Sequence, residues 1–199
     1  IGLIKRNDDE AIKYNMQSGL CSNVVTAVFE DQKHRIWMAF DNNKVAYIQD
    51  ESIFILPEYS AEARSAIRSF TEDEQGNIYW GVNDLGIVKC TLHESIPIIE
   101  ITGDQQGMPC RTFSDLTFWN GNLWMATEEG LVQWRNNQWS SVRHYLGSSL
   151  GQAFQLKPWK DRLMVWTEKG LLAFKIKRDV SQNKIQDREN QTTQFNQPH

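Results

Sequence analysis

Five side chains are the candidates for chemistry, and all five fall in segments that connect predicted strands. They carry amide, guanidinium or carboxylate groups, which are planar and can fix the orientation of a polar ligand through several hydrogen bonds. The five residues are Asn23, Arg64, Asn83, Arg111 and Glu128. Solvated loops carry the same residue types, so the interpretation depends on whether the fold brings these side chains together. The chemistry that they indicate is recognition of a small polar ligand, for example a glycan.

Patterns for bond-making chemistry or metal binding are weak. A Glu-Asp pair recurs at the ends of two predicted strands, which favours hydrogen bonding in a turn over an acid/base pair. The histidines share no ligand spacing and the cysteines form no C-x-x-C pair; these residues are His34, His93, His144, His199, Cys21, Cys90 and Cys110. No Gly-rich phosphate loop or G-x-S-x-G motif occurs. We therefore expect no catalytic residue, no metal and no cofactor.

The composition indicates a folded domain without a basic surface. Hydrophobic residues make up 40% of the 199 residues, which is enough to bury a core. The formal net charge is -4, and Lys and Arg are spread among Asp and Glu, so we expect no nucleic-acid partner. No run of about 18 apolar residues is present, so membrane attachment would need segments outside this sequence.

Two sets of landmark residues recur at nearly one spacing. The aromatic position, repeated at intervals of 42, 45 and 40 residues, holds Trp37, Tyr79, Trp124 and, in the last copy, Met164. The turn position that follows it holds Gly2, Lys44, Gly86, Gly130 and Gly170. A period of about 40 to 50 residues with several short strands in each copy is typical of the blades of a β-propeller.

Each copy contains four predicted strands. The first strands are expected at 24–31, 66–73, 112–119 and 152–159, where apolar residues alternate with polar ones. The second strand carries the aromatic landmark, the third follows the turn position, and the fourth is expected at 52–57, 96–102 and 138–145. The sequence therefore predicts an all-β fold, a β-propeller with about four four-stranded blades.

The blades are expected at 16–57, 58–102, 103–145 and 146–177, after a partial blade at 1–15 and before a polar, flexible tail at 178–199. Third strands then outnumber first strands by one, so the ends cannot close simply into a four-bladed ring. Exposed strand edges favour association. We expect either a portion of a larger propeller, of six to eight blades, or a chain that pairs with another copy.

The turn position has a predicted backbone conformation. Glycine at the turn position supplies a positive φ without steric cost. Where Lys44 replaces it, we expect Asn42 or Asn43 to adopt the left-handed conformation instead.

The tryptophans are predicted to pack rather than to bind. A blade cannot bury its faces alone, and aromatic side chains supply the most area, so Trp37 and Trp124 should lie between neighbouring blades. Trp119 and Trp159 end first strands at matching places and are also expected to pack.

The segment Ser18 to Phe40, SGLCSNVVTAVFEDQKHRIWMAF, resembles the two-component regulator propeller repeat. The pattern of that family runs roughly G-L-P-S-N-x-V-x-x-I-x-E-D-x-x-G-x-L-W-I-G-T, followed by G-G-L. Segments 107–118 and 121–131 match it less completely, and the resemblance covers about residues 1–177. Cys21 stands where the family has Pro, and Arg111 stands near its Asn position. The second copy lacks the G-L-P-S-N loop.

The resemblance implies a sensor. Such repeats typically form the periplasmic or otherwise extracytoplasmic input region of membrane-anchored bacterial regulators, ahead of a histidine kinase or diguanylate cyclase output. The expected partners are a small polar ligand and either the remaining blades of a parent protein or another copy of the chain. Two alternatives stay open, namely a scaffold for protein interactions and an enzyme like the streptogramin lyases, whose propellers share Trp-and-Gly repeats.

Overall fold

The computed structural model describes residues 2–6, 11–59, 66–103 and 106–175, and nearly all regular structure in these ranges is β-strand. Four antiparallel sheets follow one another along the chain. Sheet 1 contains β3 (Val25–Glu30), β4 (Ile36–Phe40), β5 (Val45–Gln49) and β6 (Ser52–Ile55). Sheet 2 contains β7 (Phe70–Glu72), β8 (Ile78–Val82), β9 (Gly86–His93) and β10 (Ile96–Thr102).

Sheet 3 contains β11 (Asp115–Trp119), β12 (Asn122–Thr127), β13 (Gly130–Arg135) and β14 (Gln138–Val142). Sheet 4 has three strands within the described residues, β17 (Ala153–Trp159), β18 (Arg162–Thr167) and β19 (Gly170–Phe174). An N-terminal hairpin, β1 (Leu3–Arg6) and β2 (Ala11–Tyr14), precedes the 3-10 helix η1 (Met16–Ser18) and sheet 1. A small hairpin, β15 (His144–Tyr145) and β16 (Ser148–Ser149), joins sheets 3 and 4.

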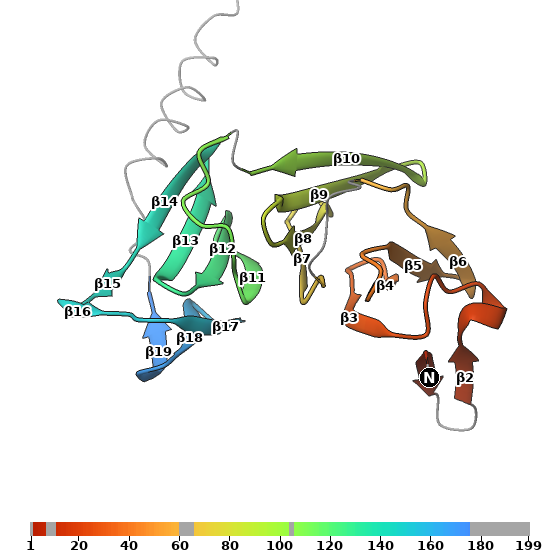
Figure 1. Ribbon diagram of the computed structural model, residues 1–199, viewed down its shortest axis with the longest axis horizontal. Helices are drawn as coiled ribbons and strands as arrows, with labels where there is room; N and C mark the ends of the chain where they lie inside the picture. The colour runs from red at the N-terminus through yellow and green to blue at the C-terminus, as the bar shows by residue number, and fades with distance from the viewer. Residues whose placement is uncertain (1, 7–10, 60–65, 104–105, 176–199) are drawn as a thin grey trace, which may run out of the picture.

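The four sheets fan around one axis, which confirms the predicted β-propeller fold (Figure 1). The first strands are innermost, with β3 beside β7, β7 beside β11 and β11 beside β17. The strands β6, β10 and β14 lie at the outside. The N-terminal hairpin and sheet 4 lie at opposite ends of the arc in Figure 1.

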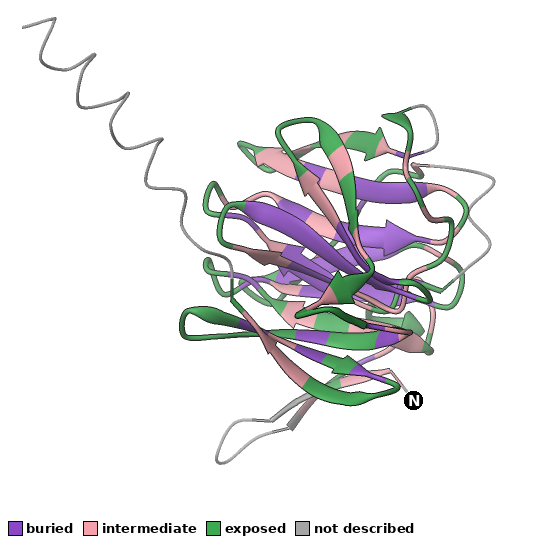
Figure 2. Cartoon of the chain, turned by 90° about the vertical axis from the view of Figure 1, so that its left-hand side faces the viewer, coloured by how far each residue is buried: buried purple, intermediate pink, exposed green. Residues whose placement is uncertain are grey.

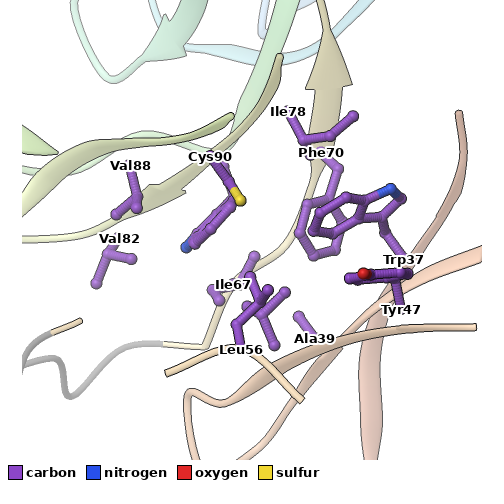
Figure 3. Close-up of a cluster of buried hydrophobic side chains, with 12 residues drawn as sticks. Trp37, Ala39, Tyr47, Leu56, Ile67, Phe70, Ile78, Val82, Val88 and Cys90 are labelled. Carbon is purple, nitrogen blue, oxygen red and sulfur yellow. The ribbon is translucent and has the colours of Figure 1, made fainter. Parts of the chain in front are cut away.

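The hydrophobic core is divided among the spaces between neighbouring sheets. The largest cluster joins sheets 1 and 2, where Trp37 and Tyr47 from sheet 1 face Phe70 and Ile78 from sheet 2 (Figure 3). Equivalent clusters join the N-terminal hairpin to sheet 1, sheet 2 to sheet 3, and sheet 3 to sheet 4. Buried residues accordingly lie along the strands inside the stack, and exposed ones lie at turns and on its outside (Figure 2). Each inner sheet thus buries both of its faces.

The predicted packing role of the repeat-locked tryptophans is confirmed. Trp37 is buried in the cluster between sheets 1 and 2, and Trp124 is buried between sheets 3 and 4. Trp119 is half-buried and packs on Trp124, with ring centroids 6.3 Å apart. The prediction for Trp159 is wrong, because its side chain is 54% exposed on the face of sheet 4 that no described sheet covers.

The turns between second and third strands follow the predicted backbone. Gly86, Gly130 and Gly170 have φ of 119°, 115° and 115°. In sheet 1, where Lys44 takes this position, Asn43 adopts a left-handed φ of 59°. The loop therefore places its positive φ one residue earlier, on a side chain that tolerates it.

The recurring aspartates are turn residues, as predicted. Asp31 accepts hydrogen bonds from the backbone amides of Lys33 and Arg35, from the Arg35 guanidinium, and from Trp37 Nε1 at 2.7 Å. Asp73 repeats the arrangement with Gln75 and Asn77, and its Oδ2 accepts the Tyr79 hydroxyl at 2.9 Å. Each aspartate thus ties the turn between the first two strands to the aromatic landmark six residues later.

Three predicted strands differ from the structure by three or more residues at one end. The fourth strand of sheet 3 was expected at 138–145 but ends at Val142, and His144–Tyr145 pairs in the small hairpin instead. Leu146 and Gly147 have φ of 51° and 81°, so the chain reverses there. The first strand of sheet 2, expected at 66–73, spans only Phe70–Glu72, and the first strand of sheet 3, expected at 112–119, begins at Asp115. The predicted tail lies outside the described residues.

Side chains of one innermost strand cap backbone amides of the next. The amides of Leu116 and Phe118 donate to Ser69 Oγ and Thr71 Oγ1, and the Leu156 amide donates to Asp115 Oδ2 at 2.8 Å. Neighbouring inner strands belong to different sheets and share no backbone hydrogen-bond ladder. These side-chain acceptors therefore satisfy amides that would otherwise lack a partner. Burial raises the pKa of Asp115 even though its carboxylate accepts hydrogen bonds from the backbone amides of Leu156 and Leu116.

Gly81 is a point of close approach between sheets 2 and 3. A Cβ atom built on Gly81 would overlap the ring of Phe113. We expect Gly81→Ala to lower the free energy of unfolding by about 1–3 kcal/mol, because the ring must move out of a packed interface. Chemical denaturation measures this change.

Phe113→Leu provides the matched background for this test. The loss caused by Gly81→Ala should shrink when the ring at position 113 is absent. An equal loss in both backgrounds would show that the Phe113 ring is not what restricts position 81.

Candidate functional site

A cavity of about 310 Å³ lies at one mouth of the central channel. Side chains from three successive sheets line it. Arg68 precedes β7 and Asn83 follows β8, while Ser114 precedes β11 and Glu128 follows β12. Gln152, which precedes β17, completes the polar lining together with Thr112, and the ring of Phe113 supplies an apolar wall.

The fold positions these groups because strand ends and turns gather at the mouth. Second strands end where the next first strands begin, so the turn after β8 faces the segment that enters β11. Asn83 Oδ1 accepts the Phe113 amide at 3.2 Å, and the Asp84 amide donates to the Arg111 carbonyl at 2.8 Å. These bonds hold the two segments of sheets 2 and 3 together at the cavity.

The cavity offers complementary polar groups to a ligand. The guanidinium of Arg68 and the carboxylate of Glu128 are exposed, and amides and hydroxyls lie between them. A guanidinium binds carboxylate or hydroxyl oxygens, and a carboxylate accepts hydrogen bonds from hydroxyl or ammonium groups. The arrangement can therefore recognise a small polar molecule, either hydroxylated or carrying both charges.

A second cavity of about 250 Å³ adjoins the first and shares Thr112 and Glu128 with it. Its rim holds an exposed ion pair, in which Arg143 Nη2 lies 2.6 Å from Glu129 Oε2. Burial raises the pKa of Cys110, which also lines this cavity, to about 11. The thiol is protonated at neutral pH and is a poor nucleophile.

The structure brings two of the five predicted site residues together. Asn83 and Glu128 line the cavity of about 310 Å³. Arg111 is exposed beside Thr112 but does not line that cavity. Asn23 lies elsewhere, where its side chain accepts the Met16 amide at 3.0 Å and its carbonyl accepts the Gly2 amide. Arg64 lies outside the described residues.

Arg68, Ser114 and Gln152 were missed by the sequence analysis. A signal for two of them was present, because aligning the predicted first strands puts Arg68 and Ser114 at the same position, third from the start. First strands line the channel of a propeller, so polar residues at their beginnings face its mouth. Gln152 begins the fourth such segment, just before a register shift in β17.

The opposite mouth of the channel has a different character. There His34 Nδ1 lies 2.7 Å from Glu30 Oε1, and both side chains are well exposed. Phe29, Phe118 and Pro158 supply apolar surface around a shallow depression. Across the described ranges, no group of three or more His, Cys, Asp or Glu is placed to hold a metal ion.

Comparisons with solved structures identify the fold. The extracellular domain of BT4673 from B. thetaiotaomicron, assigned as a hybrid two-component system, superposes with a TM-score of 0.61 and 16% identity over 82% of this chain and 22% of that domain. The corresponding domain of BT3049 gives 0.57 and 18% over 87% and 23%. This chain has a β-propeller fold that it shares with part of these two extracellular domains.

The match covers only part of those domains. The chain spans less than a quarter of the length of BT4673 or BT3049. YCF48 from Cyanidioschyzon merolae is also similar, with a TM-score of 0.60 and 10% identity over 81% of this chain and 54% of that one. No protein-family model matches the sequence, and no curated protein matches it. Within the described residues, no helix has the length and apolar character to cross a membrane.

Proposed function

We propose that this chain is the ligand-sensing propeller segment of a bacterial signal-transduction protein, located outside the cytoplasm and non-catalytic itself. The repeat pattern and the fold shared with BT4673 and BT3049 support this role. The output would be a histidine kinase or a diguanylate cyclase carried by the rest of a membrane-anchored protein. The complete propeller, of which this chain would be a portion, would have six to eight blades in total.

The observation that carries the proposal is the cavity at the channel mouth. Its charged and polar groups come from sheets 2 and 3 and from the segment entering sheet 4. A ligand that binds Arg68 and Glu128 together therefore connects neighbouring sheets. A ligand shifts an equilibrium between two arrangements of these sheets only if it binds one arrangement more tightly than the other.

The ligand class follows from the lining. A guanidinium and a carboxylate in one small cavity fit a polyhydroxylated or zwitterionic molecule better than an apolar one. The lining includes one carboxylate and, among the described residues, no histidine. It therefore does not present the His and carboxylate pair that the lyase alternative requires.

A thermal-shift screen of the chain against oligosaccharides, amino acids and small carboxylates tests the proposal. A ligand that binds only the folded state raises the melting temperature with its concentration. We expect Arg68→Ala and Glu128→Gln each to weaken binding of the hit by roughly tenfold or more, because each removes a charged hydrogen-bonding group.

Arg135→Ala is the matched control, because Arg135 is an exposed arginine at the turn between β13 and β14. It should leave the thermal shift unchanged. A hit whose stabilisation survives both cavity substitutions binds elsewhere, and this assignment of the site would then be wrong.

A scaffold for protein interactions is the second candidate function. The observation that favours it is the face of sheet 4 that no described sheet covers, where the large apolar side chains of Trp159, Trp166 and Leu171 are exposed. Surface of this kind is typical of an interaction site.

A further inference from the structure

A separate cavity of about 340 Å³ lies between sheets 2 and 3, toward their outer strands. Strands β8, β9 and β10 of sheet 2 and strands β12 and β13 of sheet 3 supply most of its lining. None of its described lining residues belongs to either cavity at the channel mouth. The side of the propeller therefore offers a place for a small molecule that is independent of the candidate site.

Sheet 2 differs from sheet 1 in the row of side chains that faces the next sheet. In sheet 1 this row pairs across β4, β5 and β6 and consists of Trp37, Tyr47 and Phe54. Its successive ring centroids are 4.9 Å apart. At the matching positions sheet 2 has Tyr79, Lys89 and Glu100. Lys89 Nζ lies 3.0 Å from Glu100 Oε2, so an ion pair stands where sheet 1 has two rings.

Sheet 3 supplies an aromatic wall to the same cavity. The row of sheet 3 that faces sheet 2 consists of Leu123, Trp134 and Trp139. The two indoles pack together with centroids 4.4 Å apart, and Trp134 lines the cavity. Ile87 and Leu123, which are 2% and 3% exposed, add apolar surface. The cavity thus combines an indole and aliphatic side chains with a neighbouring ion pair.

This combination fits a small zwitterion that carries an aromatic ring. The side chains of Lys89 and Glu100 are 33% and 60% exposed, so a ligand can reach both charges. An ammonium binds a carboxylate, a carboxylate binds an ammonium, and an indole packs well against another ring. The ligand would thus exchange one ion pair within the protein for two ion pairs with it. We propose that this cavity is a second ligand site, which binds a free amino acid with an aromatic side chain.

The ion pair favours such an amino acid over a neutral sugar. A sugar ring can also pack on Trp134, but it has no charge to offer Lys89 or Glu100. It would have to compete with their ion pair through neutral hydrogen bonds, which are weaker than charge-assisted ones. An aliphatic amino acid supplies both charges but leaves the indole without a ring to pack against.

Isothermal titration calorimetry of the full chain with L-phenylalanine tests the proposal. We expect saturable binding with a dissociation constant of about 1 mM or tighter. Trp134→Leu and Lys89→Met should each weaken binding by roughly tenfold or more, because each removes one contact with the ligand. Lys33→Met changes an exposed lysine in the turn between β3 and β4. It is the matched control for Lys89→Met and should bind like the unsubstituted chain.

Analogues of the ligand test each contact in the unsubstituted chain, so the result does not depend on whether a variant folds. Phenylpropionate lacks the ammonium group, phenethylamine lacks the carboxylate, and L-alanine lacks the ring. Each should bind at least about tenfold more weakly than L-phenylalanine.

Filling the cavity is a further test. The double substitution Lys89→Tyr and Glu100→Phe installs the residues that sheet 1 carries at these positions, Tyr47 and Phe54. It should abolish binding of L-phenylalanine. Circular dichroism spectra matching the unsubstituted chain would show that this variant and the single variants are folded.

The proposal is overturned if L-phenylalanine does not bind at about 10 mM, or if the analogues bind as tightly as it does. Unchanged binding in folded Trp134→Leu or in the folded double variant would overturn it too. Loss of binding in Arg68→Ala but not in Trp134→Leu would assign the amino acid to the channel mouth. Binding of glucose that requires Trp134, without binding of L-phenylalanine, would assign the cavity to sugars. Either of these last two results would likewise overturn the proposal.

Discussion

Asp31→Asn is expected to lower the free energy of unfolding by about 3–5 kcal/mol, because it leaves a buried guanidinium without its carboxylate. Asp31 and Arg35 are 3% and 5% exposed. The amide nitrogen of asparagine would face donors only, since the Arg35 guanidinium and Trp37 Nε1 both donate to Asp31 Oδ2. Neither can accept in return. Equilibrium unfolding in urea measures the loss.

Asp73→Asn is the matched control, because Asp73 occupies the same turn position in sheet 2 with no cation bonded to it in the described contacts. The Tyr79 hydroxyl can rotate its hydrogen away, so that its oxygen accepts a hydrogen bond from the new asparagine side-chain amide. We expect a loss of about 1–2 kcal/mol, the cost of rearranged hydrogen bonds. Equal losses in the two variants would show that the buried ion pair does not set the effect.

The effect of Asp31 should also depend on pH. Burial favours the neutral acid, but hydrogen bonds from Trp37 and Arg35 and the charge of Arg35 outweigh it and hold the pKa of Asp31 below its ordinary value. A carboxylate with a lowered folded-state pKa stabilises the fold above its ordinary pKa, and this contribution is lost as pH falls through the folded pKa. The difference between Asp31→Asn and the unsubstituted chain should therefore be constant near pH 7 and shrink below about pH 4.

Trp80→Ala is the second substitution with a large expected effect, a loss of about 3–5 kcal/mol in the free energy of unfolding. Trp80 is fully buried between sheets 1 and 2. Its ring packs edge-on against Phe70 and Tyr59, with centroids 5.9 Å and 5.6 Å apart. Removing it leaves a cavity that two rigid sheets cannot close.

Trp159→Ala provides the comparison, because Trp159 is exposed and sits at the end of sheet 4. We expect its effect on the unfolding free energy of the monomer to stay within about 0.5 kcal/mol. Chemical denaturation of both variants at low protein concentration gives the two values. A small loss for Trp80→Ala would mean that sheets 1 and 2 repack across the gap.

The repeat made the fold predictable from the sequence. Spacing alone identified Trp37 and Trp124 as packing residues, and the exception at Lys44 was resolved by the backbone preference of Asn43. These inferences succeeded because each copy of the repeat has the same turns, the same strand pairing and the same packing position between sheets. Trp159 was misjudged because burial of its face depends on a neighbour, and no local pattern reports whether a neighbour is present.

The candidate site was predictable only in part. Asn83 and Glu128 follow second strands, so the repeat register placed them at the channel mouth. Arg68 and Gln152 enter the cavity through the starts of first strands, where register shifts and short strands obscure which way a side chain faces. Asn23 has a suitable residue type and loop, but its amide oxygen is bonded to the Met16 amide.

The amide caps along the axis bear on how such a chain can evolve by duplication. Ser69 and Thr71 accept hydrogen bonds from backbone amides of sheet 3, and Asp115 accepts one from an amide of sheet 4. Each of these repeat units, one sheet with its turns, thus supplies hydrogen-bond acceptors for the unit that follows it. Ser69 and Asp115 hold the same place in their repeats, and so do Leu116 and Leu156, whose amides they cap. A tandem copy of one unit would therefore carry the cap for the unit that follows it, whereas a unit with an apolar residue at that position would leave the next amide without a cap.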